Sequence, residues 1–297
     1  MPQLYDRYFY VVVPRLYMEE DVNWENYCVE FRKEAALKGK NEEYCNTWLQ
    51  YAKALFDKGL PIIYNQEHLC LLLGYKEEYV FAVSNSASNF YRNYEIPKKN
   101  GGVREISEPL PSLKEIQRWI LDNVLSSISI SVYAKAYVKK KSIKENARFH
   151  KRQEVLLTLD VSDFFDSISS EKIYNMFLDL GYKEDVVVML TNLCCLNGCL
   201  PQGAPTSPML SNIILRQFDN VIGKYTNEKK IRYTRYADDM TFSGTFNPGQ
   251  IISVVRKELF RLGLQLNENK TRVRRKGQRQ EVTGIVVNEK VQLIKNV

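Results

Sequence analysis

The sequence predicts an α+β fold, in which amphipathic helices pack against a small antiparallel sheet. An unbroken apolar run over 156–159 ends abruptly at Asp160, which is typical of a buried strand. Residues 231–236 and 240–243 predict two more strands, joined by an acidic turn without glycine. We therefore expect the strand ends to bring Asp160 opposite Asp238 across the sheet.

Composition indicates a folded protein with a polyanionic partner. The 297 residues include 44% hydrophobic and 26% charged side chains, which is ordinary for a globular chain with two or three subdomains. The formal net charge is +7, but residues 135–152 hold eight basic side chains and one acidic one, and residues 270–279 hold six basic and none acidic. Such clusters favour binding to nucleic acid. The alternative is two solubilising faces.

Several classes of protein are disfavoured. The six cysteines form no Cys-x-x-Cys pair and there are only two histidines, so we expect free thiols in a reducing cytoplasm rather than a zinc site. Residues 1–6 lack the basic and apolar segments of a signal peptide, and no apolar run is long enough to span a membrane. The sequence thus predicts a cytoplasmic protein without a membrane partner.

The first 80 residues predict a small helical region. Residues 42–58 show amphipathic periodicity and are followed by Gly59 and Pro61, and residues 66–73 form a shorter helix that ends at Gly74. Trp48 could stack on a nucleobase, but its place on the apolar stripe favours the core.

A basic hairpin and two capped helices follow. Residues 94–96 and 103–106 flank an Asn-Gly-Gly turn. A Ser-x-x-Glu box at 112–115 predicts one helix start, and a second box at 142–145 predicts another. The second helix carries Asn146 and His150, spaced to share one face.

The segments after the strand that ends at Asp160 are less regular. Asp163 and Asp166 lie past that strand, with a spacing that suggests a solvated turn. In the loop over 200–208, Gly203 would let the backbone approach a nucleotide closely. Ser207 is expected to cap the helix that follows it.

The adjacent carboxylates of Asp238 and Asp239 would repel each other unless a cation lies beside them. Magnesium suits such a place, because it takes hard oxygen ligands and leaves positions open for phosphate oxygens. The alternative is a solvated acidic turn.

Four motifs, in order, resemble reverse transcriptases over residues from about 94 to 287. They are the basic hairpin at 96–104, the acidic strand at 156–166, the Pro-Gln-Gly loop at 200–208 and the Arg-Tyr-Ala-Asp-Asp-Met stretch at 235–240. Within that family, Asn-Ala-Arg-Phe-His at 146–150 and Val-Thr-Gly at 282–284 resemble motifs of bacterial retron enzymes.

The resemblance implies a right-hand polymerase with palm and fingers and a helical N-terminal preface. The family normally continues into a helical thumb, for which this sequence has no counterpart, so we expect either that a second subunit supplies the grip or that the chain is shortened. The expected divisions are 1–80 for the N-terminal region, 81–152 for fingers and basic connector, 153–280 for the palm and 281–297 for its end.

The resemblance also implies site residues. Two Mg²⁺ ions, with Mn²⁺ as a substitute, would be held by Asp160, Asp238, Asp239 and the Val161 carbonyl, and Lys270 would give a proton to pyrophosphate. Phe165 would be the steric gate against ribose, although simple core packing is the alternative. The implied nucleotide-binding residues are Lys98, Arg104, Asp163, Phe164, Phe165 and Gln202. The expected RNA-binding residues are Lys139, Lys140, Lys141, Asn146, His150, Arg272, Arg274 and Arg275.

The implied activity is RNA-directed synthesis of single-stranded DNA from dNTPs, on a structured non-coding RNA, in a retron antiphage system with an effector protein as a further partner. The alternatives are a different defence-associated or group II intron-like reverse transcriptase, and a catalytically silent palm that only binds RNA.

Overall fold

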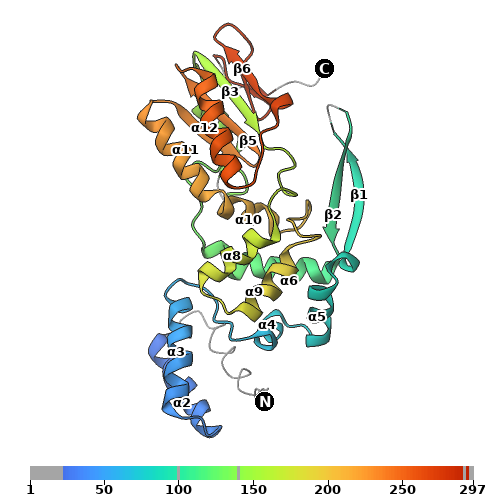
Figure 1. Cartoon of the computed structure of the whole chain (residues 1–297), viewed down its shortest axis with the longest axis vertical. Coiled ribbons are helices and arrows are strands. Elements are labelled where there is room, and N and C mark those ends of the chain that lie inside the picture. The colour runs from blue at the N-terminus through green and yellow to red at the C-terminus, as the bar shows by residue number, and fades with distance from the viewer. Residues whose placement is uncertain (1–22, 99–100, 139–140, 290–291, 294–297) are drawn as a thin grey trace. The chain divides into compact units, whose positions relative to one another are not determined.

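The computed structural model describes residues 23–98, 101–138, 141–289 and 292–293, and the chain divides into two compact units (Figure 1). The first unit comprises residues 1–127, 170–198 and 203–206, and the second comprises 128–169, 199–202 and 207–297. Neither is a continuous piece of sequence. The six cysteines, all among the described residues, form no disulfide with one another. No described helix is long and apolar enough to cross a membrane.

The first unit is mostly helical. Tyr64 lies at the centre of an aromatic cluster, and its hydroxyl lies 2.5 Å from that of Tyr27. Trp48 packs edge-on against Tyr64, with the Lys183 ammonium 3.3 Å from the Trp48 ring centroid. Trp48 is therefore a packing residue, as predicted. The helices are α2 (Trp24–Leu37), α3 (Glu42–Phe56), α4 (Gln66–Leu73), α5 (Glu77–Asn85), α6 (Pro111–Asn123), α8 (Ser170–Leu180) and α9 (Glu184–Cys194).

A two-stranded hairpin extends from this unit (Figure 1). Strands β1 (Tyr91–Pro97) and β2 (Val103–Pro109) pair antiparallel over their whole length. The predicted turn falls partly on 99–100, which lie outside the described residues. The predicted cap of α6 is wrong: Leu110 is the N-cap without a side-chain hydrogen bond, and the helix starts at Pro111. Proline suits the first helical position because its missing N–H would have no partner there.

The second unit is built on a four-stranded antiparallel sheet in the order β4-β5-β3-β6. Helix α11 packs on β4, and α12 packs on α11 (Figure 1). Between helix and sheet, Tyr233 stacks on Phe242 with ring centroids 4.8 Å apart. The elements are β3 (Val155–Asp160), α10 (Ser207–Ile214), α11 (Arg216–Glu228), β4 (Arg232–Tyr236), β5 (Asp239–Gly244), α12 (Pro248–Arg261) and β6 (Arg272–Arg275).

Helix α7 (Ile143–Phe149) begins with the predicted capping box and contacts β4 and the small sheet β7-β8-β9. Ala147 of α7 shares a buried cluster with Leu156 of β3 and with Val282 and Ile285 of the small sheet. The two segments that resemble retron motifs therefore pack on each other. The strands are β7 (Glu281–Val282), β8 (Ile285–Val286) and β9 (Gln292–Leu293).

Candidate active site

The acidic stretch forms a tight turn between β4 and β5. Tyr236 pairs with Asp239 in register, so Ala237 and Asp238 make the turn. Ala237 has φ of 58°, a left-handed conformation that costs a residue with a Cβ about 1–2 kcal/mol. Arg235 donates from Nη1 to the Ala237 carbonyl over 3.0 Å, which stabilises this backbone geometry.

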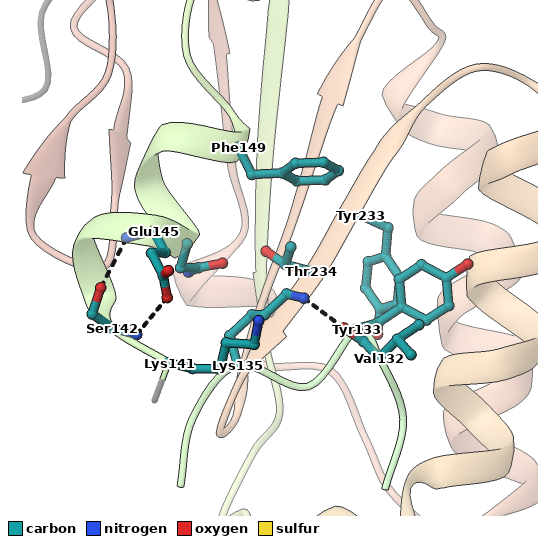
Figure 2. Close-up of a pocket in the computed structure, with 10 residues that line it drawn as sticks. Val132, Tyr133, Lys135, Lys141, Ser142, Glu145, Phe149, Tyr233 and Thr234 are labelled. Carbon is teal, nitrogen blue, oxygen red and sulfur yellow. Dashed lines mark hydrogen bonds between the residues drawn. The ribbon is translucent and has the colours of Figure 1, made fainter. Parts of the chain in front are cut away.

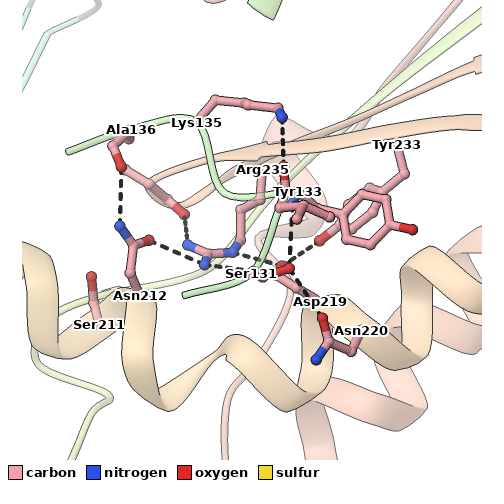
Figure 3. Close-up of polar contacts among 12 residues, drawn as sticks. Ser131, Tyr133, Lys135, Ala136, Ser211, Asn212, Asp219, Asn220, Tyr233 and Arg235 are labelled. Carbon is pink, nitrogen blue, oxygen red and sulfur yellow. Dashed lines mark hydrogen bonds and ion pairs between the residues drawn. The ribbon is translucent and has the colours of Figure 1, made fainter. Parts of the chain in front are cut away.

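A buried ion pair between Arg235 and Asp219 lies beneath the turn and fixes the position of Arg235 (Figure 3). Both oxygens of Asp219 accept hydrogen bonds from the guanidinium, at 2.9 Å from Nε and 2.8 Å from Nη2. Asn212 accepts a further bond from Nη2 at 3.2 Å, and the Tyr233 hydroxyl donates to Asp219 at 2.7 Å. Neither member of the charge pair has an exposed side chain. The turn is thus held by α10 and α11 from below.

The three predicted carboxylates meet at the end of the sheet. Asp160 pairs in register with Asp239, not with Asp238, because Asp238 occupies the turn. The Val161 N–H donates to the Asp238 carbonyl over 3.3 Å, which ties the end of β3 to that turn. Asp160 itself is buried, at 5% exposed, and the Asn267 N–H donates to its carbonyl at 2.8 Å.

The surroundings of Asp239 change its protonation. Burial and, to a lesser extent, the negative charges of Asp238 and Asp160 together raise the pKa of Asp239 to about 7. An acid with a pKa near neutrality is stabilised in its charged form by any cation placed beside it.

Lys270 supplies one such cation. Its ammonium lies 3.0 and 2.8 Å from the two carboxylate oxygens of Asp160. Burial alone would lower the pKa of Lys270, but the Asp160 hydrogen bond and the neighbouring carboxylates outweigh it and raise that pKa. The Lys270 side chain is 58% exposed, whereas that of Asp160 is 7% exposed.

The site combines clustered hard oxygen donors with the half-exposed ammonium group of Lys270. That chemistry suits a substrate with phosphate oxygens. Among the described residues, no group of three acidic, histidine or cysteine side chains is already arranged to hold a metal ion. Lys270 bonds both Asp160 oxygens, so a cation at these acids would share Asp160 with the ammonium group.

The family of reverse transcriptases, described as RNA-dependent DNA polymerases, matches residues 96–287. Retron Ec86 reverse transcriptase of Escherichia coli is 33% identical over 256 residues, covering 84% of this chain and 78% of that protein. The chain belongs to the retron-type reverse transcriptases. Retron Mx65 reverse transcriptase of Myxococcus xanthus is 32% identical, covering 77% of this chain and 60% of that one.

The fold is similar to that of a solved telomerase from Candida tropicalis, truncated from its C-terminal domain. The TM-score is 0.50 at 13% identity, over 74% of this chain and 61% of that chain. At such low identity the likeness bears on the fold alone, and it agrees with the α+β right-hand polymerase architecture.

Other residues predicted for this reverse transcriptase lie just past β3. Phe164 is buried and Phe165 is half-buried, with ring centroids 5.2 Å apart. Asp163 is exposed, as expected for a turn, with φ of 43°. Their nucleotide-binding roles stay predictions.

The Pro-Gln-Gly loop differs from expectation in two details. Gln202 is half-exposed, but a Cβ on Gly203 would lie 2.6 Å from the Ser107 carbonyl oxygen, so the glycine accommodates β2. Ser207 does not act as a helix cap. It is the first residue of α10, and its hydroxyl donates to the Pro201 carbonyl at 2.7 Å.

The predicted basic residues are exposed wherever the structure describes them. Lys98 and Arg104 lie on the hairpin of the first unit. In the second unit, Lys141 lies just before α7, whereas Lys139 and Lys140 fall outside the described residues. The three arginines of β6 line the edge of the four-stranded sheet: Arg272, Arg274 and Arg275.

His150 requires a correction. The sequence interpretation placed it in contact with RNA, but its side chain is fully buried. Its ring nitrogens lie 2.8 Å from the Ser243 hydroxyl and 2.7 Å from the Thr234 hydroxyl, so it braces β4 and β5. Burial also lowers its pKa to about 3.

Sequence reasoning missed the pair of Arg235 and Asp219. Arg235 borders the acidic motif, and Asp219 interrupts an otherwise apolar helix face. An acidic residue on such a face is a signal for a buried cationic partner, because an unpaired buried charge is strongly destabilising.

Proposed function

We propose that this reverse transcriptase copies a structured non-coding RNA into single-stranded DNA, and that it does so with two divalent metal ions. The observation that carries the proposal is the meeting of Asp160, Asp238 and Asp239 beside Lys270 at one sheet end. By its similarity to retron enzymes, the RNA would belong to a retron that serves in antiphage defence, with an effector protein as partner.

The carboxylates of Asp160, Asp238 and Asp239, with the Val161 carbonyl, would hold two Mg²⁺ ions, and Mn²⁺ is a substitute for them. When bound, such ions activate the primer hydroxyl and neutralise the leaving pyrophosphate. The raised pKa of Asp239 supports a cation there, since a cation relieves the mutual repulsion of the acids. Lys270 is then positioned to give a proton to the leaving group.

The incoming dNTP would contact groups from several elements. Arg104 and Lys98 would bind its triphosphate, because exposed cations on the hairpin suit phosphate oxygens. Phe165 would exclude a ribose 2′-hydroxyl, with Asp163, Phe164 and Gln202 beside the same nucleotide. The ratio of ribonucleotide to deoxyribonucleotide incorporation by Phe165→Val, compared with that of the wild type, measures this gate.

The metal assignment is tested with Asp238→Asn. Because the amide cannot replace the carboxylate charge, we expect primer extension to fall by about a thousandfold, while RNA binding stays near that of the wild type. Asp179→Asn, which changes an exposed acid on α8, is the matched control and should extend at the wild-type rate. Extension by Asp238→Asn at the wild-type rate would contradict the assignment.

The same assay separates the polymerase from a palm that only binds RNA. Purified wild-type protein that binds RNA but never extends a primer, with either Mg²⁺ or Mn²⁺, would favour the silent module. Sequencing the nucleic acid that copurifies distinguishes a retron RNA from the RNA of an intron-like or other defence-associated enzyme.

We also propose that the exposed arginines of β6, together with Lys139, Lys140 and Lys141, bind phosphates of the RNA. Each phosphate contact releases counterions, so the logarithm of affinity falls with the logarithm of salt concentration. Replacing Arg272, Arg274 and Arg275 with glutamine should lower that slope by about 2, at about 0.7 per contact. Filter binding at several salt concentrations measures it, and an unchanged slope would indicate only a solubilising role.

A further inference from the structure

A cavity of about 370 Å³ lies in the second unit between α7, β4 and the segment that precedes α7. Figure 2 shows Phe149 at one end, Tyr133 and Tyr233 along one side and Lys135 near the centre. The volume falls within the range of about 300–1,000 Å³ that is typical of small-molecule sites. None of Asp160, Asp238 and Asp239 lines this cavity, so it is a separate feature from the catalytic carboxylates.

Asn146 is the unusual member of the cavity wall. Its side chain is 2% exposed, yet neither its amide oxygen nor its amide nitrogen has a hydrogen-bond partner among the described residues. A buried amide without partners is costly, because it has lost water and gained nothing in exchange. An amide left so inside a cavity indicates that a ligand or water completes it.

The other polar groups nearby are already engaged. The Thr234 hydroxyl bonds His150, and the Tyr233 hydroxyl donates to Asp219. Ser142 and Glu145 bond each other in the capping box of α7. Asn146 therefore contributes one donor and one acceptor side by side, which is the pattern that an asparagine uses to bind the N6 and N7 edge of adenine.

The remaining walls suit a base attached to a phosphate. Phe149 is 48% exposed, so a planar ring has an aromatic face to stack on. Lys135 and Lys141 line the same cavity, and Glu145 is the one acid among its lining residues. The lining thus carries two ammonium groups against one carboxylate, which favours an anion.

We propose that this cavity binds one unpaired nucleotide of the RNA, with its base on the Asn146 amide, its ring on Phe149 and its phosphate near Lys141, and that adenine is the preferred base. The inference rests on the proposed RNA-copying function and adds to it a site of base recognition outside the catalytic centre. A free nucleotide shares this chemistry, so the test must separate the two sources.

The experiment uses the full chain with fluorescently labelled oligo(A), oligo(U) and oligo(C) RNA, without dNTPs or divalent metal, and fluorescence anisotropy as the readout. We expect oligo(A) to bind about tenfold tighter than the others. Asn146→Leu, which has nearly the same shape, should bind all three equally. An Asn146→Leu variant that keeps the adenine preference overturns the proposal and leaves water as the partner of the amide.

Lys141 and Lys144, three residues apart, provide a matched pair of variants. Lys141→Gln should weaken all three oligomers several-fold, because it removes a phosphate contact regardless of base. Lys144→Gln changes an exposed lysine of α7 outside the cavity and should stay within about twofold of the wild type. Equal losses for both variants would contradict a phosphate position at Lys141. Adenosine monophosphate that binds as tightly as oligo(A) would identify a free-nucleotide site and overturn the RNA assignment.

A measurement on the unchanged protein covers the case in which Asn146→Leu does not fold. RNA that carries 8-azidoadenosine should photo-crosslink to peptides within 142–149, as identified by mass spectrometry. Crosslinks confined to other peptides overturn the proposal. A wild-type protein that extends a generic primed template but shows no base preference would refute the cavity alone, whereas failure of extension refutes the proposed polymerase.

Discussion

Two aspartate–cation pairs flank the β4–β5 hairpin. Their nitrogen–oxygen distances are equal, but the exposure of their side chains differs. Arg235 and Asp219 approach to 2.8 Å with both side chains fully buried. Lys270 and Asp160 also approach to 2.8 Å, but the lysine is 58% exposed. The first pair has no replacement partner available, since water cannot reach it. In the second pair the lysine is open to solvent, so water can replace the ammonium group's contact with Asp160.

One pair therefore fixes the turn from inside the protein, whereas the other is partly open to solvent. A buried pair that loses one partner leaves an uncompensated charge in a medium of low dielectric constant. In the second pair Lys270 is solvated once it leaves, but Asp160 stays only 7% exposed, so its loss should cost less than that of the fully buried pair and more than that of a surface pair. Stability and catalysis should therefore separate between the two sides of the hairpin.

The largest expected effect is on Arg235→Met. The variant should lose about 3–5 kcal/mol of unfolding free energy, because Asp219 stays buried without its partner. Urea unfolding measures the loss. The double variant Arg235→Met/Asp219→Leu should recover part of it, since no unpaired charge remains. A single variant within 1 kcal/mol of the wild type would show that the buried pair does not hold the turn.

Lys270→Gln should give the opposite result. We expect a smaller loss of unfolding free energy than for Arg235→Met, because Lys270 is half-exposed although Asp160 is buried, but primer extension about a hundredfold slower, as for loss of a general acid. Lys276→Gln is the control, because Lys276 pairs with Glu154 at 2.7 Å where both side chains are exposed. It should change neither quantity. A strongly destabilised Lys270→Gln protein would remove the distinction between the pairs.

The smallest expected effect per residue is the pH dependence of unfolding free energy that the buried histidines His150 and His68 cause. Burial, together with the positive charges of Arg232 and Lys135, lowers the pKa of His150 to about 3. Burial alone lowers the pKa of His68 to about 3. In the unfolded chain the histidines protonate near pH 6.5. The contribution of each buried, neutral histidine to the free energy of unfolding is therefore full above about pH 6.5 and is lost as the pH falls toward 3. At pH 5 each histidine should lower the free energy of unfolding by about 2 kcal/mol relative to neutral pH.

Unfolding free energies at pH 7 and pH 5 check this for wild type, His150→Gln and His68→Gln. Each variant should reduce the loss by about 2 kcal/mol. Protonation of Asp239, whose pKa is about 7, stabilises the folded state over the same range and offsets part of the loss equally in all three proteins. Equal pH dependence in all three proteins would mean that other groups govern the acid sensitivity.

Local sequence signals predicted the parts of the site that lie within a few residues of one another. The strand that ends at Asp160, the acidic turn and the capping box at Ser142 all appear where expected. Their catalytic and binding roles stay predictions. The partners of Arg235 and His150 could not be predicted in the same way, because they come from elements far along the chain. Gly203 shows the same limit, since Ser107 lies almost a hundred residues earlier.

The strand order of the four-stranded sheet has a consequence for synthesis on the ribosome. Val155 of β3 pairs with Gly244 of β5 and with Arg275 of β6, so the central strand must wait for most of the remaining chain to emerge. Pairings over such sequence separations are slow to form, because the connecting loop must close first. During that interval the apolar residues of β3 lack their sheet partners. Translation speed between β3 and β6 should therefore affect the yield of folded enzyme more than translation speed before residue 155.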